Sequence, residues 1–191
     1  VCREIRAQAA FFGRRRIRTV FMGGGTPTLL SAAQLSRLLV AVNRYLAPLP
    51  DCEISIESNP ETLTSEKIAV LKQHITRISL GVQSFDSSLR ATLGRNCSGD
   101  ALKNAVTLIQ HAAFEHFNCD LIYAVPGGSM AQWINDLDMV ISCGVDHVSC
   151  YNLTCEEQSL LGGTFIIDDD MAKEMYDMAQ ARLEKVGISR Y

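Results

Sequence analysis

The sequence predicts an α/β fold in which parallel strands and outer helices form a partial (βα) barrel. Five apolar segments with the character of strands are each followed by a segment of helical periodicity, which is typical of a parallel sheet with right-handed crossovers. The pattern shows no sign of a reversal in strand order, which favours a barrel over a doubly wound sheet. Glycines and polar residues stand where the strands end, at the edge where a barrel gathers its ligand-binding loops.

Composition limits the functional classes. Of the 191 residues 47% are hydrophobic, so residues 1–191 can form the core of a single domain. The net charge of -3 and the pI near 5.8 give no electrostatic case for binding nucleic acid. No segment has the pattern of a membrane span or a signal peptide, which predicts a cytoplasmic protein. The seven cysteines lack paired C-x-x-C spacing, so they predict neither a zinc site nor an iron-sulfur cluster by themselves.

Periodicity and capping residues place each element along the chain. Apolar runs predict strands at 17–22, 53–57, 77–82, 117–123 and 147–153. Helical spacing predicts helices at 1–12, 31–47, 64–71, 102–109, 129–143 and 171–186, with a short helix that reaches Leu93. Ser31 with Gln34, and Ser129 with Gln132, match the capping box that starts a helix.

The loop after the first strand has the composition of a ligand-binding loop. Three consecutive glycines, Gly23 to Gly25, are followed by Thr26-Pro27-Thr28. Glycine lets bare backbone approach a ligand closely, and three in a row exceed what a tight turn needs. No lysine completes a nucleotide P-loop, and Thr28 stands where the dinucleotide fingerprint needs glycine. A purely structural turn between strand and helix is the alternative.

Polar residues end the other strands as well. Glu57 ends the second strand, Gln83 the third and Asn152-Leu153-Thr154 the last, while Asp120 lies on the fourth. A carboxylate at the end of an apolar strand is costly unless it meets a cation or several donors. Each residue alone fits an ordinary cap or turn. Together they predict one polar pocket at the mouth of the barrel.

Six segments of the chain match motifs of one known family: Gly-Gly-Gly-Thr-Pro-Thr (23–28), Ile-Glu-Ser-Asn-Pro-Glu-Thr (56–62), Arg-Ile-Ser-Leu-Gly-Val-Gln-Ser-Phe (77–85), Leu-Gly-Arg (93–95), Asp-Leu-Ile-Tyr (120–123) and Gly-Ile-Ser-Arg-Tyr (187–191). On these segments, which occur in family order, the sequence resembles radical S-adenosylmethionine (SAM) proteins of the oxygen-independent coproporphyrinogen III oxidase and HemW haem-chaperone group. One departure is Ala-Val-Pro-Gly-Gly (124–128), where the family usually has Gly-Leu-Pro-Gly-Gln.

The resemblance implies a set of residues that contact SAM or line its site. These residues are Gly24, Gly25, Thr26, Glu57, Gln83, Arg95, Asp120 and Thr154. Backbone groups and the Thr26 hydroxyl would meet the polar end of SAM, and the charge of Glu57 suits its cationic parts or ribose hydroxyls. Thr154 matches a position where the family has a different residue type. Gln83 and Arg95 have an alternative role as hydrogen-bonding residues at a strand end and a helix end.

The resemblance also implies the cofactors. A reduced 4Fe-4S cluster cleaves SAM in this family, and the protein positions the reactants and shields the radical. The family holds its cluster through a Cys-x3-Cys-x2-Cys loop after the first barrel strand, and this chain lacks that loop. The expectation is a radical SAM core fragment that lacks the first strand, the cluster loop and the C-terminal domain. SAM cleavage is then expected of the complete protein and not of these 191 residues.

Three functions remain open at this point. The first is a HemW-like protein that binds haem and delivers it to an acceptor, which residues 58–60, 83–85 and 93–95 favour. The second is an oxidase that decarboxylates coproporphyrinogen III to protoporphyrinogen IX. Either would need an electron donor, and the first a haem acceptor. The third is a non-radical barrel enzyme that uses the glycine loop for another small ligand.

Overall fold

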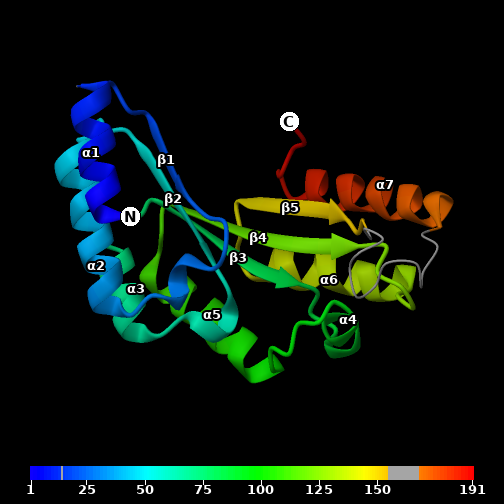
Figure 1. Cartoon of the computed structure of the whole chain (residues 1–191). Coiled ribbons are helices and arrows are strands. Elements are labelled where there is room, and N and C mark those ends of the chain that lie inside the picture. The colour runs from blue at the N-terminus through cyan, green and yellow to red at the C-terminus, as the bar shows by residue number, and fades with distance from the viewer. Residues whose placement is uncertain (14, 155–167) are drawn as a thin grey trace. The chain divides into compact units, whose positions relative to one another are not determined.

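The protein is built from alternating strands and helices (Figure 1). The computed structural model describes residues 1–13, 15–154 and 168–191, so Cys155 lies outside the described residues. The strands are β1 (Thr19–Met22), β2 (Glu53–Ser58), β3 (Arg77–Gln83), β4 (His116–Tyr123) and β5 (His147–Asn152). They form one sheet in the order β1-β2-β3-β4-β5, and the pairs β1–β2, β2–β3 and β4–β5 are parallel. The predicted α/β class and the absence of a strand-order reversal are confirmed.

The helices follow the predicted order. They are α1 (Cys2–Phe12), α2 (Ala32–Ala41), α3 (Ser65–Leu71), α4 (Ser87–Thr92), α5 (Gly99–Ala112), α6 (Met130–Ser142) and α7 (Asp169–Lys185). Short helical turns occur at η1 (Pro27–Leu29), η2 (Val42–Leu46) and η3 (Pro60–Thr62). Both predicted capping boxes are formed, at Ser31 with Gln34 and at Ser129 with Gln132. In the described parts of the chain, no helix combines the length and apolar character that crossing a membrane requires.

Several boundaries differ from the sequence prediction, most of them by one to three residues. The first strand begins at Thr19 rather than at residue 17, because its ladder partner β2 begins only at Glu53 after the Pro50-Asp51 turn. The helix after Ser31 changes its hydrogen-bond pattern at Val42 and continues as the π-helical η2. Periodicity alone does not reveal such a change, since the apolar face continues through it.

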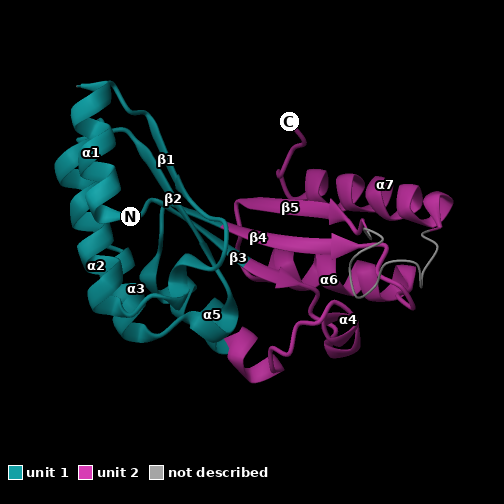
Figure 2. Ribbon diagram, viewed as in Figure 1, with its two compact units in different colours: residues 1–80, 104–117 teal, residues 81–103, 118–191 magenta. Residues whose placement is uncertain are grey.

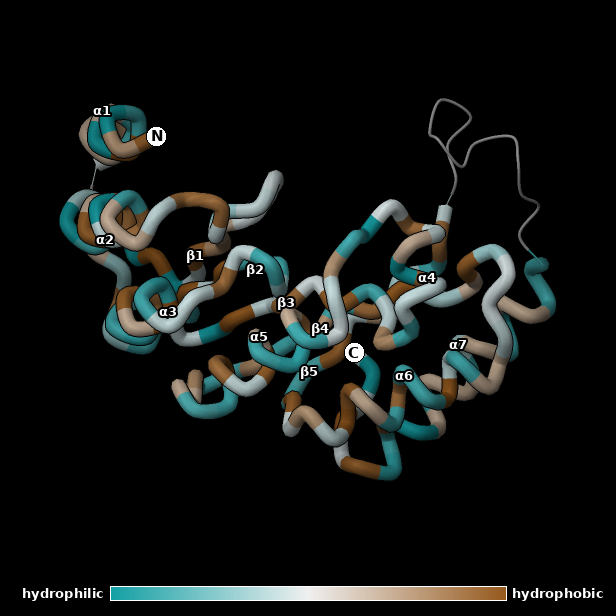
Figure 3. Tube along the Cα trace, turned by 90° about the horizontal axis from the view of Figure 1, so that it is seen from below, coloured by the Kyte–Doolittle hydropathy of each residue, from teal (hydrophilic) through white to brown (hydrophobic). Residues whose placement is uncertain are grey.

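The chain divides into two compact units (Figure 2). Unit 1 comprises residues 1–80 and 104–117, and unit 2 comprises residues 81–103 and 118–191. In unit 1, Ile54, Ile56 and Ile78 are buried, and α2 packs against α3. In unit 2, α7 packs against both α6 and β5. Figure 3 shows hydrophobic and hydrophilic residues succeeding one another along the elements of each unit.

The alternation along β2 decides where polar groups lie. Successive side chains of a strand point to opposite faces, so Glu53, Ser55 and Glu57 share the face opposite to Ile54 and Ile56. The isoleucine face is buried, whereas the two glutamates are half-buried. One face of this strand thus serves the core, and the other carries hydrogen-bonding groups.

The turn after β4 holds a strained alanine. Ala124 is buried and has a φ of 57°, a left-handed conformation in which a Cβ crowds the backbone. This position is also where the chain departs from the usual glycine of the group it resembles. The strain is therefore a property of this sequence rather than of the turn.

Replacing Ala124 with glycine is expected to stabilise the protein. Ala124→Gly removes the crowding at positive φ, which outweighs the added entropy of the unfolded chain by roughly 0.5–1 kcal/mol. Urea unfolding followed by circular dichroism measures the change. The matched control is Ala131→Gly, an exposed site in the ordinary helix α6, which should destabilise the protein by about 1 kcal/mol. Equal losses in both variants would contradict this account of Ala124.

Candidate functional site

The glycine loop lies directly beyond the end of β1. Gly24 has a φ of 106°, a conformation that other residues rarely adopt. A Cβ at Gly23 would lie 2.6 Å from the carboxyl carbon of Glu57 and 2.5 Å from the Phe21 ring, so any other residue there would displace these two side chains. A Cβ at Gly25 would have no atom within 4 Å, so that position is open. The backbone conformation thus favours glycine at position 24, and the positions of Phe21 and Glu57 favour it at position 23.

Glu57 reaches over this loop from the neighbouring strand. The register pairs Met22 with Ile56, which places Glu57 beside Gly23, the next residue of the β1 strand and loop. The Gly24 backbone N–H donates to Glu57 Oε2 at 3.1 Å. The structure therefore brings together two of the predicted site residues, Gly24 and Glu57, in direct contact.

Thr26 and the segment after β1 are braced by the segment after β2. The Asn59 amide donates to Thr26 Oγ1 at 2.8 Å, and the Thr62 hydroxyl donates to the Asn59 carbonyl at 2.7 Å. The buried Thr28 hydroxyl is 2.6 Å from Thr62 Oγ1. Lys67 Nζ donates to the carbonyls of both Thr28 and Thr62, at 2.6 and 2.8 Å. These contacts fix the shape of the loop that follows the glycines.

Sequence reasoning missed three of these bracing residues. Asn59 and Thr62 belong to the Ser-Asn-Pro-Glu-Thr segment (58–62), which was used for the resemblance without a role for either side chain. Lys67 belongs to α3 and lies 39 residues further along the chain than Thr28. An isolated lysine on a helix gives no local signal of such a contact.

Gln83 ends β3 in a strained turn. Its φ is 66°, and the Ser84 backbone N–H donates to the Val82 carbonyl at 2.9 Å. A positive φ inside an i to i+2 hydrogen bond is the rare form of the γ-turn. A non-glycine residue in such a conformation costs on the order of 1–3 kcal/mol and persists only where the surroundings impose it. Strain of this kind at a predicted site residue supports a functional role.

The other predicted residues of unit 2 take different positions. Arg95 is exposed, and its backbone N–H donates to the Arg90 carbonyl at 2.8 Å. Asp120 accepts a hydrogen bond of 2.8 Å from the Asn118 amide and is paired in register with Ser149 of β5. Thr154 is exposed, two residues beyond the end of β5. That Gln83, Arg95, Asp120 and Thr154 meet Glu57 and the glycine loop in one pocket remains a prediction.

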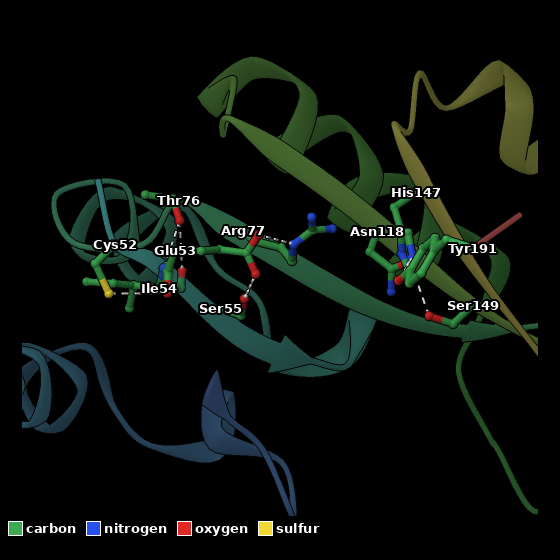
Figure 4. A network of polar contacts seen from close by, with 10 residues as sticks. All are labelled: Cys52, Glu53, Ile54, Ser55, Thr76, Arg77, Asn118, His147, Ser149 and Tyr191. Carbon is green, nitrogen blue, oxygen red and sulfur yellow. Dashed lines mark hydrogen bonds and ion pairs between the residues drawn. The ribbon is translucent and has the colours of Figure 1, made fainter. Parts of the chain in front are cut away.

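A separate polar network in unit 1 lies at the amino end of β2 (Figure 4). Glu53 forms an ion pair with Arg77 at 3.1 Å and accepts a hydrogen bond of 2.9 Å from Ser55. Burial acts to raise the pKa of Glu53, but the hydrogen bonds from Ser55 and Arg77 outweigh it and lower the pKa below its ordinary value. Polar residues at this end of a barrel strand serve stability rather than catalysis.

Unit 2 has its own network at the amino end of β5 (Figure 4). His147 contacts the Asn118 side chain through Nδ1 and the Tyr191 hydroxyl through Nε2, the latter at 2.7 Å. The Ser149 hydroxyl donates to the same Asn118 oxygen at 3.3 Å. None of these residues is among the site residues predicted from the sequence.

The described residues offer no ligand set for a metal. Residues 1–13, 15–154 and 168–191 contain no group of three or more His, Cys, Asp or Glu side chains that could hold an ion. Within the described residues, the cysteines at 2, 52, 97, 119, 143 and 150 form no disulfide. Burial raises the pKa of the Cys150 thiol to about 12.

Comparison with known proteins shows related sequences in several organisms. The heme chaperone HemW of Mycobacterium tuberculosis is 36% identical over 195 aligned positions, which cover 98% of this chain and 50% of the relative. The heme chaperone HemW of Synechocystis is 35% identical over 198 positions, which cover 100% of this chain and 48% of the relative. The chain thus spans about half the length of the curated relatives it matches.

Comparison with solved structures shows the same fold. The coproporphyrinogen III oxidase HemN from Escherichia coli, a radical SAM enzyme, matches with a TM-score of 0.86 and 24% identity over 97% of this chain and 44% of its own. The family model of the Radical SAM superfamily matches residues 1–140 of the sequence. These findings confirm the resemblance drawn from the six motif segments. The chain belongs to the radical SAM superfamily.

Proposed function

We propose that this chain is the SAM-binding core of a HemW-like haem chaperone, with residues 1–191 as one piece of its radical SAM domain. The support from relatives is that curated HemW proteins are 30–36% identical over nearly the whole chain. The observation that carries the SAM site is the contact between Glu57 and the Gly24 N–H. The six described cysteines form no disulfide, which suits a reducing compartment such as the cytoplasm.

The residues of unit 1 fit the polar end of SAM. A Cβ at Gly24 or Gly25 would meet no atom within 4 Å, so a ligand can lie against bare backbone there. The half-buried Glu57 carboxylate supplies negative charge for the amino group or the ribose hydroxyls. Thr26 accepts a hydrogen bond from Asn59, and its own hydroxyl proton can be donated to a ligand carboxylate. In the proposed site these groups bind and orient SAM.

The second set of residues would hold the rest of the ligand. Gln83, Arg95, Asp120 and Thr154 supply an amide, a guanidinium, a carboxylate and a hydroxyl from unit 2. Together with a reduced 4Fe-4S cluster, bound SAM supplies radical chemistry in this superfamily. The described residues do not fit the cluster, since they hold no ligand set for it. Under this proposal the cluster ligands belong to other parts of the protein.

The product of the complete gene tests the function directly. After anaerobic reconstitution with iron and sulfide, the proposal predicts that it retains haem and leaves coproporphyrinogen III unchanged. Absorbance of the haem complex and chromatography of the porphyrins measure the two outcomes. Conversion of coproporphyrinogen III to protoporphyrinogen IX would contradict the chaperone function and support the oxidase function instead. An identified electron donor and haem acceptor would complete the chaperone assignment.

Removing the Glu57 carboxylate is expected to impair SAM cleavage. Glu57→Ala loses both the charge and the acceptor for the Gly24 N–H, and we expect cleavage to fall by at least about tenfold. Glu57→Gln keeps an acceptor for the Gly24 N–H but removes the charge, so it tests the charge separately from the hydrogen bond. The measurement is the release of 5′-deoxyadenosine under reducing conditions.

Glu61 provides the matched control for Glu57. It is an exposed glutamate in η3, only four residues further along the chain, so Glu61→Gln removes one negative charge from the same segment. Its cleavage rate should stay within about twofold of the wild type. Unchanged cleavage in Glu57→Ala would remove Glu57 from the site.

A methyl group at Gly23 should weaken SAM binding through Glu57. The new Cβ of Gly23→Ala would meet the Glu57 carboxyl group at 2.6 Å, so the carboxylate must move and its bond to Gly24 breaks. We expect a loss of about tenfold in SAM affinity by calorimetry. In a Glu57→Ala background the same change should cost much less, because only the exposed Phe21 ring then remains to be displaced. Additive losses would show that Gly23 and Glu57 act independently.

A further inference from the structure

Three buried polar side chains surround the turn that ends β3. Ser84 is 0% exposed, Arg90 2% and Asp136 1%. Ser84 follows Gln83 in the strained turn, Arg90 lies in α4, and Asp136 lies in the middle of α6. Buried polar groups of this kind need complete hydrogen bonding, and no unsatisfied buried side-chain atom occurs among the described residues.

Asp136 holds the turn from one side. Its carboxylate accepts a hydrogen bond of 2.6 Å from the Ser84 hydroxyl and one of 2.7 Å from the Phe85 backbone N–H. The Ser84 oxygen in turn accepts from the Asp86 N–H at 3.0 Å. Burial raises the pKa of Asp136, although the hydrogen bonds from Ser84 and Phe85 act to lower it. A carboxylate in so dry a place is costly, and the turn is its hydrogen-bonding partner.

Arg90 holds the turn from the other side. Its Nη1 donates to the Ser84 carbonyl at 2.8 Å, and its Nε donates to the Cys97 carbonyl at 3.2 Å. The carbonyl of Arg90 itself accepts from the Arg95 N–H at 2.8 Å. One buried guanidinium therefore ties the turn of Gln83 to the segment that carries Arg95.

These contacts explain how Gln83 keeps its unfavourable backbone. The residue after it is fixed at its hydroxyl by Asp136 and at its carbonyl by Arg90, and the next N–H is fixed by Asp136 as well. A positive φ at a non-glycine residue persists where the surrounding structure over-determines it. We propose that Asp136 is a positioning residue, which together with Arg90 holds Gln83 in the orientation that SAM binding requires. The proposal rests on the proposed function for its ligand.

The variant Asp136→Asn tests the positioning role. Asparagine keeps the size of the side chain, and its oxygen can still accept from the Phe85 N–H. Its amide nitrogen only donates, so the bond accepted from the Ser84 hydroxyl is lost together with the charge. In the complete gene product we expect the KM for SAM to rise about tenfold while kcat stays within about twofold. Hydrogen exchange of the Phe85 amide should accelerate by about the same factor.

The neighbouring Leu137 supplies the matched control. It lies on the same helix, is 0% exposed, and has a purely apolar role in the core. Leu137→Ala should lower the unfolding temperature at least as much as Asp136→Asn and leave the KM for SAM within about twofold. The proposal would be overturned if the KM for SAM rose in both variants in proportion to their loss of stability. An unchanged exchange rate of the Phe85 amide in Asp136→Asn would also overturn it.

The two proposals fail in different ways. If the wild-type protein does not bind SAM, the proposed function fails, and exchange at Phe85 alone decides whether Asp136 holds the turn. If the wild type binds SAM and Asp136→Asn opens the turn without changing the KM, Gln83 is not positioned for SAM, and the further inference is wrong.

Discussion

The site of unit 1 depends on one hydrogen bond, from the Gly24 backbone N–H to the Glu57 carboxylate. The bond depends on glycine at position 23, since a Cβ there would lie 2.6 Å from the Glu57 carboxyl group and displace it. It also requires the parallel register of β1 and β2, which pairs Met22 with Ile56 and so places Glu57 beside the glycine loop. The sheet, the glycine loop and the acidic residue are thus one arrangement, and a change in any of them disturbs the other two.

The turn of Gln83 in unit 2 follows a different principle. In unit 1 the residue with positive φ is a glycine, for which that conformation carries little strain. In unit 2 it is a glutamine, which buried charged groups hold in a strained conformation. The strain costs on the order of 1–3 kcal/mol, which hydrogen bonds to buried charged groups can offset. A glycine there would relieve the strain but would remove the side-chain amide. This trade between backbone ease and side-chain chemistry is typical of binding sites.

Local sequence patterns predicted the parts of the fold that depend on local interactions. The capping boxes of Ser31 and Ser129 join residues three positions apart, so the sequence displays both partners together. Glycines between an apolar strand and a helix carry a similar local signal. Asp136 carries no local signal, because its partner Ser84 is 52 residues away. From the sequence alone, a carboxylate within a helix is expected to face solvent. The γ-turn at Gln83 was equally hidden, since glutamine does not mark positive φ.

The central claim, which is a proposal, is that the predicted site residues bind one SAM molecule. A crystal structure of the complete gene product with SAM bound tests it most directly. The account predicts that the ligand lies against the backbone of residues 23–25, with Glu57, Gln83 and Asp120 all within hydrogen-bond distance of it. A ligand bound elsewhere, or these three side chains facing separate cavities, would contradict the account.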